Sequence, residues 1–392
     1  MRTLWRGLAT SQITNSRPHY FMWVDFLRGL AAFAVLVSHY QHFYFASADE
    51  PNLADPSVEP FYRQLHALYM HGAASVELFW VISGFVFASI YAETAAPVKA
   101  ADFAVNRFAR LYPLHFVTLI VIAALQFVSN SKFGHYQIYP YNDVYHFILN
   151  LGFASSWGLE QGFSYNGPIW SVSVEVLIYA AFFVSIPYIS RRPMLTPVVA
   201  LFFSLLLASG IPGKHVWQCG ACFFLGCFAF KMWKTLDSSG ARPPLLAGGV
   251  GALLAVLAHF LTAHMTAEHS AQITKLIAFP SLVLIAASFD RLDVFGLGSK
   301  VRVVGDLTYS TYLLHIPVQI STLIILESLG VDRAVVSSVW FFAGFLIVVF
   351  VISHFSFKYL ETPSRVAIRD YMLKRKSGGQ DRLLLRGGSK AA

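Results

Sequence analysis

The sequence predicts an all-α protein embedded in a membrane, and its composition is the first observation behind that prediction. Of the 392 residues, 56% are hydrophobic and 13% are charged, with a mean hydropathy of +0.55, whereas soluble domains carry about 25% charged residues. A water-soluble core could not hide so much apolar surface. A bilayer solvates it and requires only that backbone groups be paired internally, as they are in helices. We therefore expect a polytopic helical bundle.

The second observation is the spacing of the apolar stretches. A helix needs about 20 apolar residues to cross the hydrocarbon core of a bilayer, and the chain offers about ten such stretches. They divide the sequence into an N-terminal segment (1–21), a membrane domain (22–360) and a basic, partly disordered cytoplasmic tail (361–392). The predicted spans are residues 22–43, 73–92, 111–129, 170–189, 195–211, 216–233, 244–262, 272–289, 306–328 and 335–357.

The distribution of basic residues is the third observation, because lysine and arginine are enriched in cytoplasmic loops. With both termini in the cytoplasm, most of the 29 lysines and arginines face inward. This bias also accounts for the net charge of +8, so we expect a lipid bilayer around the chain and no nucleic-acid partner. The basic residues left outside are Arg63, Lys132, Lys214, Lys275 and Arg333.

The three cysteines do not form a metal site. Cys219, Cys222 and Cys227 share one apolar stretch, with no histidine or carboxylate beside them in the sequence. We expect buried free thiols and no bound metal.

Polar side chains interrupt the first span. Asp25, Arg28 and His39 lie in it, and a charge inside a membrane helix costs a few kcal/mol or more unless it faces a partner or a wet cavity. Arg28 and His39 lie about 16 Å apart along a helix, close to three turns, and so point to one face. They could line one channel, the cation binding an anion and the imidazole transferring a proton. Alternatively, Arg28 snorkels to lipid phosphate and His39 bonds a neighbouring helix.

Two arginines open the third span. Arg107 and Arg110 are three residues apart and share one face if the segment is helical. Their guanidinium groups could hold phosphates by paired hydrogen bonds. The alternative is that they are ordinary cytoplasmic flanking charges.

Further polar residues lie in the fourth and ninth spans. Glu175, in the sequence IWSVSVEVLIY, needs a partner or a proton at its depth. It could orient an imidazole, accept a proton from a substrate hydroxyl or pair with a structural cation. In the ninth span, Tyr312 and His315 are neighbours at one helical turn, and we expect them to support the site.

Taken together, these segments resemble the bacterial membrane acyltransferase-3 family. FLRGLAAFAVLVSHY resembles the family's opening block, including the spacing between Arg28 and His39. The other blocks follow in the family's order and extend over residues 26–366: ELFWVISGF, RFARLYPLHF, IWSVSVEVLIY, LTYSTYLLHIPV and FKYLETPSRV. Each block alone is a weak pattern, but six in order are specific.

The resemblance implies a ten-span, multi-pass enzyme of the bacterial plasma (inner) membrane. Such enzymes transfer an acyl group, commonly acetyl, from cytoplasmic acyl-CoA to hydroxyls of cell-envelope or secreted carbohydrates or glycolipids, with acyl-CoA as co-substrate and no bound cofactor. It implies that His39 is the catalytic histidine, that Arg28 is its motif partner and that Arg107 and Arg110 bind the donor. Glu175 matches the glutamate of the tryptophan, serine and glutamate block, and we assign it to catalysis with His39.

The chain also departs from the family pattern. Val176 stands where many members carry a second acidic residue, and no esterase-like domain follows the membrane domain. We therefore expect the protein to act alone or to pass its acyl group to a separate extracytoplasmic partner. His39 can act as a general base on the acceptor hydroxyl or as a nucleophile, and the sequence does not choose between them.

Two other functions use the same residues. A secondary transporter would employ intramembrane histidine, arginine, glutamate and aspartate, although the repeated halves common in transporters are not visible in this sequence. A non-catalytic scaffold would tolerate replacement of His39.

Overall fold

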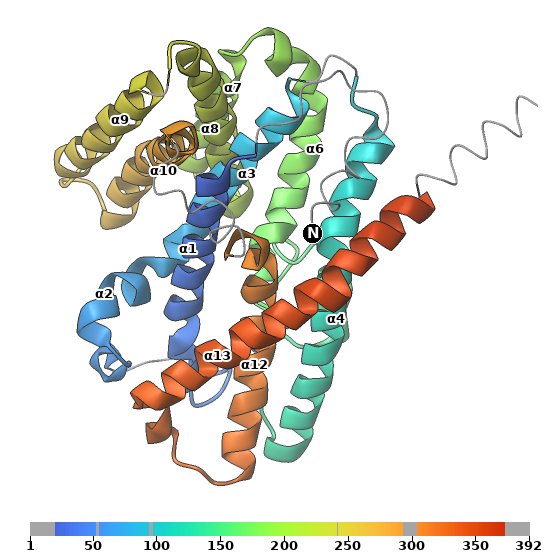
Figure 1. Ribbon diagram of the computed structural model, residues 1–392. Coiled ribbons are helices and arrows are strands. Elements are labelled where there is room, and N and C mark those ends of the chain that lie inside the picture. The colour runs from blue at the N-terminus through green and yellow to red at the C-terminus, as the bar shows by residue number, and fades with distance from the viewer. Residues whose placement is uncertain (1–19, 52–54, 94–96, 241, 293–303, 373–392) are drawn as a thin grey trace, which may run out of the picture.

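The computed structural model describes residues 20–51, 55–93, 97–240, 242–292 and 304–372, and every regular element in these ranges is helical (Figure 1). Nine helices of the described part are long and apolar enough to cross a membrane. The prediction of a polytopic helical bundle is therefore confirmed. The predicted segments 1–21 and 361–392 lie largely outside the described residues.

Among the described residues, the first half of the chain contributes five helices and two 3-10 turns that directly adjoin helices. These elements are α1 (Met22–Ser38), η2 (His39–Tyr44), α2 (Tyr62–His71), η4 (Gly72–Ala74), α3 (Ser75–Tyr91), α4 (Ala100–Phe133) and α5 (Val144–Leu151).

Among the described residues, the second half contributes seven helices and a π turn within the helical run that ends at Met372. These elements are α6 (Ile169–Arg191), α7 (Leu195–Ala208), α8 (Lys214–Asp237), α9 (Arg242–Leu261), α10 (Ala267–Leu292), α12 (Thr308–Ser328), α13 (Val339–Ser356) and the π turn η7 (Phe357–Glu361).

Three elements differ from the spans expected from the sequence. Helix α7, in place of the span at 195–211, has 14 residues, about 21 Å at the helical rise, which is short of the hydrocarbon thickness. Helix α4 has 34 residues and begins at Ala100, so the two arginines lie inside it. The helical run that starts at Val339 continues to Met372 and passes through the domain boundary predicted at residue 360. Ser310 donates a hydrogen bond to Glu361, which ties that part of the run to α12.

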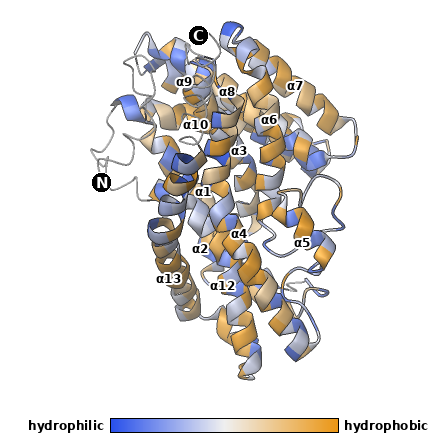
Figure 2. Cartoon of the chain, turned by 90° about the vertical axis from the view of Figure 1, so that its right-hand side faces the viewer, coloured by the Kyte–Doolittle hydropathy of each residue, from blue (hydrophilic) through white to orange (hydrophobic). Residues whose placement is uncertain are grey.

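Large apolar side chains cover the outer surface of the bundle. Trp340 on α13 is 82% exposed, Leu253 on α9 is 71% exposed and Leu205 on α7 is 60% exposed, and Figure 2 shows hydrophobic residues on the outer side of α7. In water such a surface would aggregate, but lipid tails solvate it. The polar groups of the spans face the interior instead.

Helix α1 lies against α3, α10 and α12 and occupies the middle of the bundle (Figure 1). Two hydrogen bonds join α1 to α12 and the residues just before α12, and their residue numbers increase in the same direction along both segments. Arg28 Nη2 donates to the carbonyl of Gly305 at 2.9 Å, and His39 Nδ1 lies 2.8 Å from His315 Nε2. The two helices are therefore parallel, and Arg28 and His39 face the same neighbour, as their spacing predicts.

Helices α3 and α8 cross with their backbones in close approach. A Cβ atom on Gly84 would lie 1.8 Å from the carbonyl oxygen of Phe223, and one on Gly226 would lie 1.9 Å from that of Val81. Close approach over small residues is a common way for membrane helices to associate. Gly84, the glycine in ELFWVISGF, therefore permits this helix packing. The three cysteines of α8 are free and buried at this side of the bundle.

We predict that Gly84→Ala and Gly226→Ala each destabilise the protein by about 1–3 kcal/mol or more, because the added methyl group meets backbone atoms that cannot move aside. Thermal unfolding of the purified protein in detergent measures the effect. Gly249→Ala and Gly344→Ala are matched controls, since both glycines are helical and have nothing within 4 Å of an added Cβ. Equal stability of the two pairs of variants would contradict the close crossing.

Candidate active site

His39 and His315 form a hydrogen-bonded pair at the end of α1. His39 Nδ1 lies 2.8 Å from His315 Nε2, and His315 Nδ1 lies 3.2 Å from the carbonyl oxygen of Thr311. A carbonyl only accepts, so His315 Nδ1 carries a proton and its Nε2 accepts from His39 Nδ1–H. In neutral His39 the lone pair therefore resides on Nε2. No described residue bonds that nitrogen.

A third imidazole and an amide complete this cluster. His42 Nδ1 lies 3.2 Å from Gln319 Oε1, while Gln319 Nε2 donates to the backbone carbonyl of His39 at 2.8 Å. The rings of His39 and His42 stack with centroids 4.9 Å apart. His315, His42 and Gln319 are all buried. The cluster fixes the position of His39, since both its ring and its backbone are bonded to α12.

Tyr312 faces another part of the bundle. Its hydroxyl lies 2.8 Å from Ser171 Oγ and 3.0 Å from the carbonyl of Pro168, so it joins α12 to the start of α6. Its ring centroid is 6.3 Å from that of His315. Tyr312 therefore supports the wall beside His315 and makes no hydrogen bond to His39.

Arginines gather toward the other end of α1. Arg28 pairs with Asp25 at 3.0 Å. Arg110 interacts electrostatically with Arg28, Arg107 and Arg365, as well as with Asp25. Four guanidinium groups from α1, α4 and the end of the α13 run therefore share one region of the interior.

Arg107 and Arg110 differ in how firmly they are held. Arg107 Nη2 donates to the hydroxyl of Tyr91 at 3.3 Å, and its guanidinium carbon lies 4.6 Å from the centre of the Phe87 ring. Within the described part of the chain, Arg110 donates no hydrogen bond. Arg110 thus has its donors available for an anionic ligand, whereas Arg107 already uses one N–H group and keeps a buried Nε without a partner.

Carboxylates offset much of this positive charge. Glu175 interacts with the hydroxyls of Ser83 and Tyr179 and electrostatically with Arg107 and Arg110. Glu361 accepts from Ser310 and interacts with Arg110 and Arg365. The carboxylates give the arginines the partners that charges in a membrane require. They also leave Arg110 free to bind phosphate without breaking a bond of its own.

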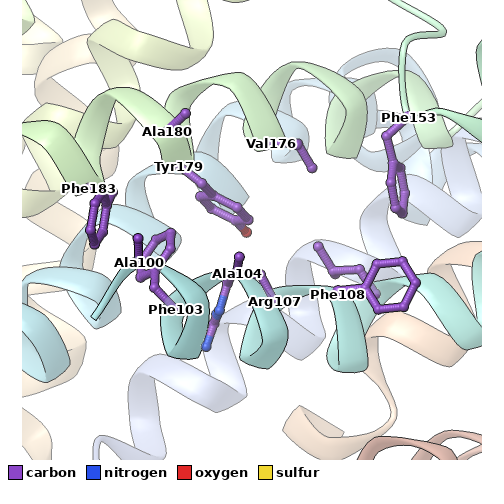
Figure 3. Close-up of a pocket in the computed structure, with 11 residues that line it drawn as sticks. Ala100, Phe103, Ala104, Arg107, Phe108, Phe153, Val176, Tyr179, Ala180 and Phe183 are labelled. Atoms are coloured by element: carbon purple, nitrogen blue, oxygen red, sulfur yellow. The ribbon is translucent and has the colours of Figure 1, made fainter. Parts of the chain in front are cut away.

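An apolar cavity of about 330 Å³ lies between α4 and α6 and flanks the arginine cluster (Figure 3). Its polar members are Arg107 and Tyr179, and Figure 3 shows the ring of Tyr179 pointing into it. It extends from Ala100 to Phe153 and contains no member of the histidine cluster. The cavity is therefore separate from the imidazoles.

The structure brings the predicted site residues into two groups. His39 and His315 form one, and Asp25, Arg28, Arg107, Arg110 and Glu175 form the other. Glu175 lies with the arginines and makes no described contact with His39, so the group that orients the imidazole is His315.

Sequence reasoning missed several partners. His42 follows His39 by three residues, a spacing that could have indicated a shared face, but Gln319 carries no local signal. Glu361 and Arg365 stand in the block FKYLETPSRV, without any pattern that shows their contact with α4.

The fold and the site define a class of protein: a helical membrane protein whose spans hold a histidine pair at one depth and an arginine cluster at another. A family model described as an acyltransferase domain, of the acyltransferase-3 type, matches residues 21–355. The chain therefore belongs to this family of membrane acyltransferases, as the sequence blocks indicate.

Two curated proteins are similar to this chain. The peptidoglycan O-acetyltransferase OatA of Listeria monocytogenes is 22% identical over 332 residues, which cover 75% of this chain and 51% of the relative. Protein 2 in the picA locus of Rhizobium radiobacter is 30% identical over 114 residues, which cover 29% of this chain and 49% of the relative. The chain thus spans about half the length of the curated relatives it matches. No solved structure matches it.

Proposed function

We propose that this protein transfers an acyl group from cytoplasmic acyl-CoA to a hydroxyl of a cell-envelope or secreted carbohydrate or glycolipid. Acetyl is the acyl group to test first. The site would lie in the plasma (inner) membrane of a bacterium. The observation that carries the proposal is the hydrogen bond between His39 Nδ1 and His315 Nε2, which leaves the lone pair of His39 Nε2 for the reaction. Family membership and the similarity to an O-acetyltransferase support the reaction class.

The arginine cluster supports entry of the donor from the cytoplasmic side. Acyl-CoA carries several phosphate charges, and guanidinium groups bind phosphate through charge-assisted hydrogen bonds. Arg28, Arg107 and Arg110 lie on the N-terminal, cytoplasmic side of His39 according to the distribution of basic residues. A donor held there would direct its thioester toward His39 along the parallel helices α1 and α12.

The mechanism assigned to His39 places the reacting atom at Nε2 and gives His315 the role of holding the ring. Nε2 takes the proton of the acceptor hydroxyl or attacks the thioester carbonyl. In both routes the imidazole gains positive charge, and His315 holds the ring through Nδ1–H. Glu175 is proposed to act on the donor side, where it positions Arg107 and Arg110.

We predict that His39→Gln lowers acyl transfer by about 10²–10⁴-fold, the usual contribution of a positioned acid–base group. Glutamine keeps a neutral polar side chain of similar size, so the variant should remain folded. Mass spectrometry of envelope and secreted glycans measures the acyl gain in cells that produce wild type or His39→Gln. Cells that lack the gene are the control. Comparable acyl gain with His39→Gln and wild type would refute the proposed mechanism.

His315 tests the positioning of the imidazole. His315→Gln keeps an acceptor for His39 Nδ1–H, whereas His315→Leu removes it and leaves that donor unpaired. We expect activity to fall in the order wild type, His315→Gln, His315→Leu, with the loss in His315→Leu below the roughly 10²–10⁴-fold expected for His39→Gln. The measurement is initial rate at saturating donor. If the two variants are equally active, the hydrogen bond does not orient His39.

The donor site gives a third prediction. Each charge-assisted hydrogen bond contributes about 1.5–3 kcal/mol, so Arg110→Ala should weaken acyl-CoA binding by about tenfold or more. Arg107→Ala should have a smaller effect because Arg107 is engaged by Tyr91 and Phe87. Arg107→Lys should be only partly tolerated, because lysine lacks the planar fork.

Affinity is measured on purified protein in detergent at low and high salt. The weakened variants should also show a flatter salt dependence, since fewer charges remain to be screened. Arg192→Ala is the matched control: it removes the same charge from the exposed end of α6. Unchanged affinity in both Arg107→Ala and Arg110→Ala would mean that these arginines only balance the buried carboxylates.

A further inference from the structure

Two histidine rings stack at the end of α1, and a third joins them edge to edge through a hydrogen bond. The ring centroid of His39 lies 4.9 Å from that of His42, with an interplanar angle of 22°, and 5.1 Å from that of His315, with an angle of 24°. His39 is the middle ring. The proposed function uses His39 and His315 and leaves the third ring without a role.

The order of residues along the chain gives His39 two different sides. Along α1 and η2, Arg28 comes first, His39 follows and His42 lies beyond it. The arginine cluster therefore lies on one side of His39 and His42 on the other. The ring of His42 also lies 5.2 Å from that of Phe45 and 5.6 Å from that of Tyr139, two residues that follow the first and third predicted spans on the outer side. A donor and an acceptor that approach from opposite sides would meet different neighbours of His39.

The hydrogen bonds of Gln319 fix the tautomer of His42. Gln319 Nε2 donates to the carbonyl of His39, so its Oε1 is the atom that faces His42 Nδ1. That oxygen only accepts, and His42 Nδ1 therefore carries the proton. No described residue bonds His42 Nε2. Like His39, His42 thus presents an unshared lone pair on Nε2.

A covalent route requires a second base. Once His39 Nε2 carries the acyl group, it has no lone pair with which to accept the proton of the acceptor hydroxyl. His315 Nε2 already accepts from His39. Tyr139 cannot serve, because burial raises the pKa of its hydroxyl above the usual value, with Tyr312 acting in the same direction, and the protonated phenol is not a base. Glu175 lies with the arginines.

We propose that His42 is the general base for the acceptor hydroxyl in a two-step transfer, in which His39 Nε2 carries the acyl group between donor and acceptor. This inference rests on the proposed function and extends it, since it chooses the nucleophilic route and assigns the second half-reaction. Its support is the stacked ring on the side of His39 away from the arginines, with its own lone pair free.

Atoms and electron pairs are conserved in both steps. In the first, the lone pair of His39 Nε2 forms a C–N bond to the thioester carbonyl carbon, the C–S bond breaks and coenzyme A leaves as its thiolate. In the second, His42 Nε2 takes the proton of the acceptor hydroxyl while its oxygen forms a C–O bond to the acyl carbon. The C–N bond breaks and its electron pair returns to His39 Nε2. The proton on His42 passes through water to the thiolate, which restores both imidazoles.

The experiment separates the two steps in purified protein in detergent. Acetyl-CoA is added alone, and release of coenzyme A and the mass of the intact protein are followed over time. Glycan extracted from the envelope and medium of cells lacking the protein is then added as the acceptor. The variants are His42→Gln and His42→Ala. His115→Gln is the matched control, because His115 is a buried histidine of α4 that bonds the carbonyl of Asn150 and not the stack.

With wild type, we expect one equivalent of coenzyme A to be released rapidly and the protein to gain the mass of one acetyl group. The His42 variants should retain this first step within about twofold. Their transfer to glycan should slow by about 10²–10⁴-fold, so that acetyl-protein accumulates. Added imidazole should accelerate transfer in His42→Ala, because it can enter the space of the missing ring, and should not affect His115→Gln.

Three results would overturn the assignment of His42. One is transfer at the wild-type rate in both variants. A second is equal loss of both steps in variants whose thermal stability is unchanged, which would give His42 a positioning role for His39. The third is a wild-type protein that transfers acetyl without ever carrying it, which would establish direct transfer and leave the proposed function intact. The proposed function itself fails if cells producing the wild-type protein show no acyl gain on their glycans over cells lacking the gene.

Discussion

The cost of an unpartnered polar group in lipid governs this structure. Water cannot solvate such a group within the spans, so each one must find a protein partner or a wet cavity. Asp25, Arg28 and Gly305 satisfy one another, and His39 is bonded to His315. The first set joins α1 to the residues just before α12, and the second joins the end of α1 to α12 itself. The contacts that satisfy the polar groups therefore also place the candidate reactive atom at a fixed position between two helices.

The same requirement separates the site into two parts. Arginines balanced by Glu175 and Glu361 form a charged region, whereas the histidine cluster is held by neutral hydrogen bonds. Such different surroundings suit the charged donor and the neutral hydroxyl acceptor that we propose. The close crossing of α3 and α8 at Gly84 and Gly226 supports the arrangement indirectly, because Ser83, beside that crossing, faces Glu175.

Within the histidine cluster, the tautomer of each ring decides which of its nitrogens offers a lone pair. The carbonyl of Thr311 sets the tautomer of His315, which in turn places the lone pair of His39 on Nε2. Gln319 does the same for His42 while holding the backbone of His39. Helix α12 thus determines which nitrogen carries the proton in the two imidazoles of η2.

The sequence by itself determined the helical membrane fold, the approximate spans and the polar residues that interrupt them, because hydrophobic length and the cost of buried charge are local properties of the chain. The spacing of Arg28 and His39 also determined their common face. Only the tertiary structure decided the partners: His315 rather than Glu175 for His39, Tyr91 and Phe87 for Arg107, and Glu361 and Arg365 around Arg110. It also decided that α7 is short and that the last helix passes residue 360. These outcomes depend on contacts between helices far apart in the chain, and no local pattern encodes which buried groups will meet.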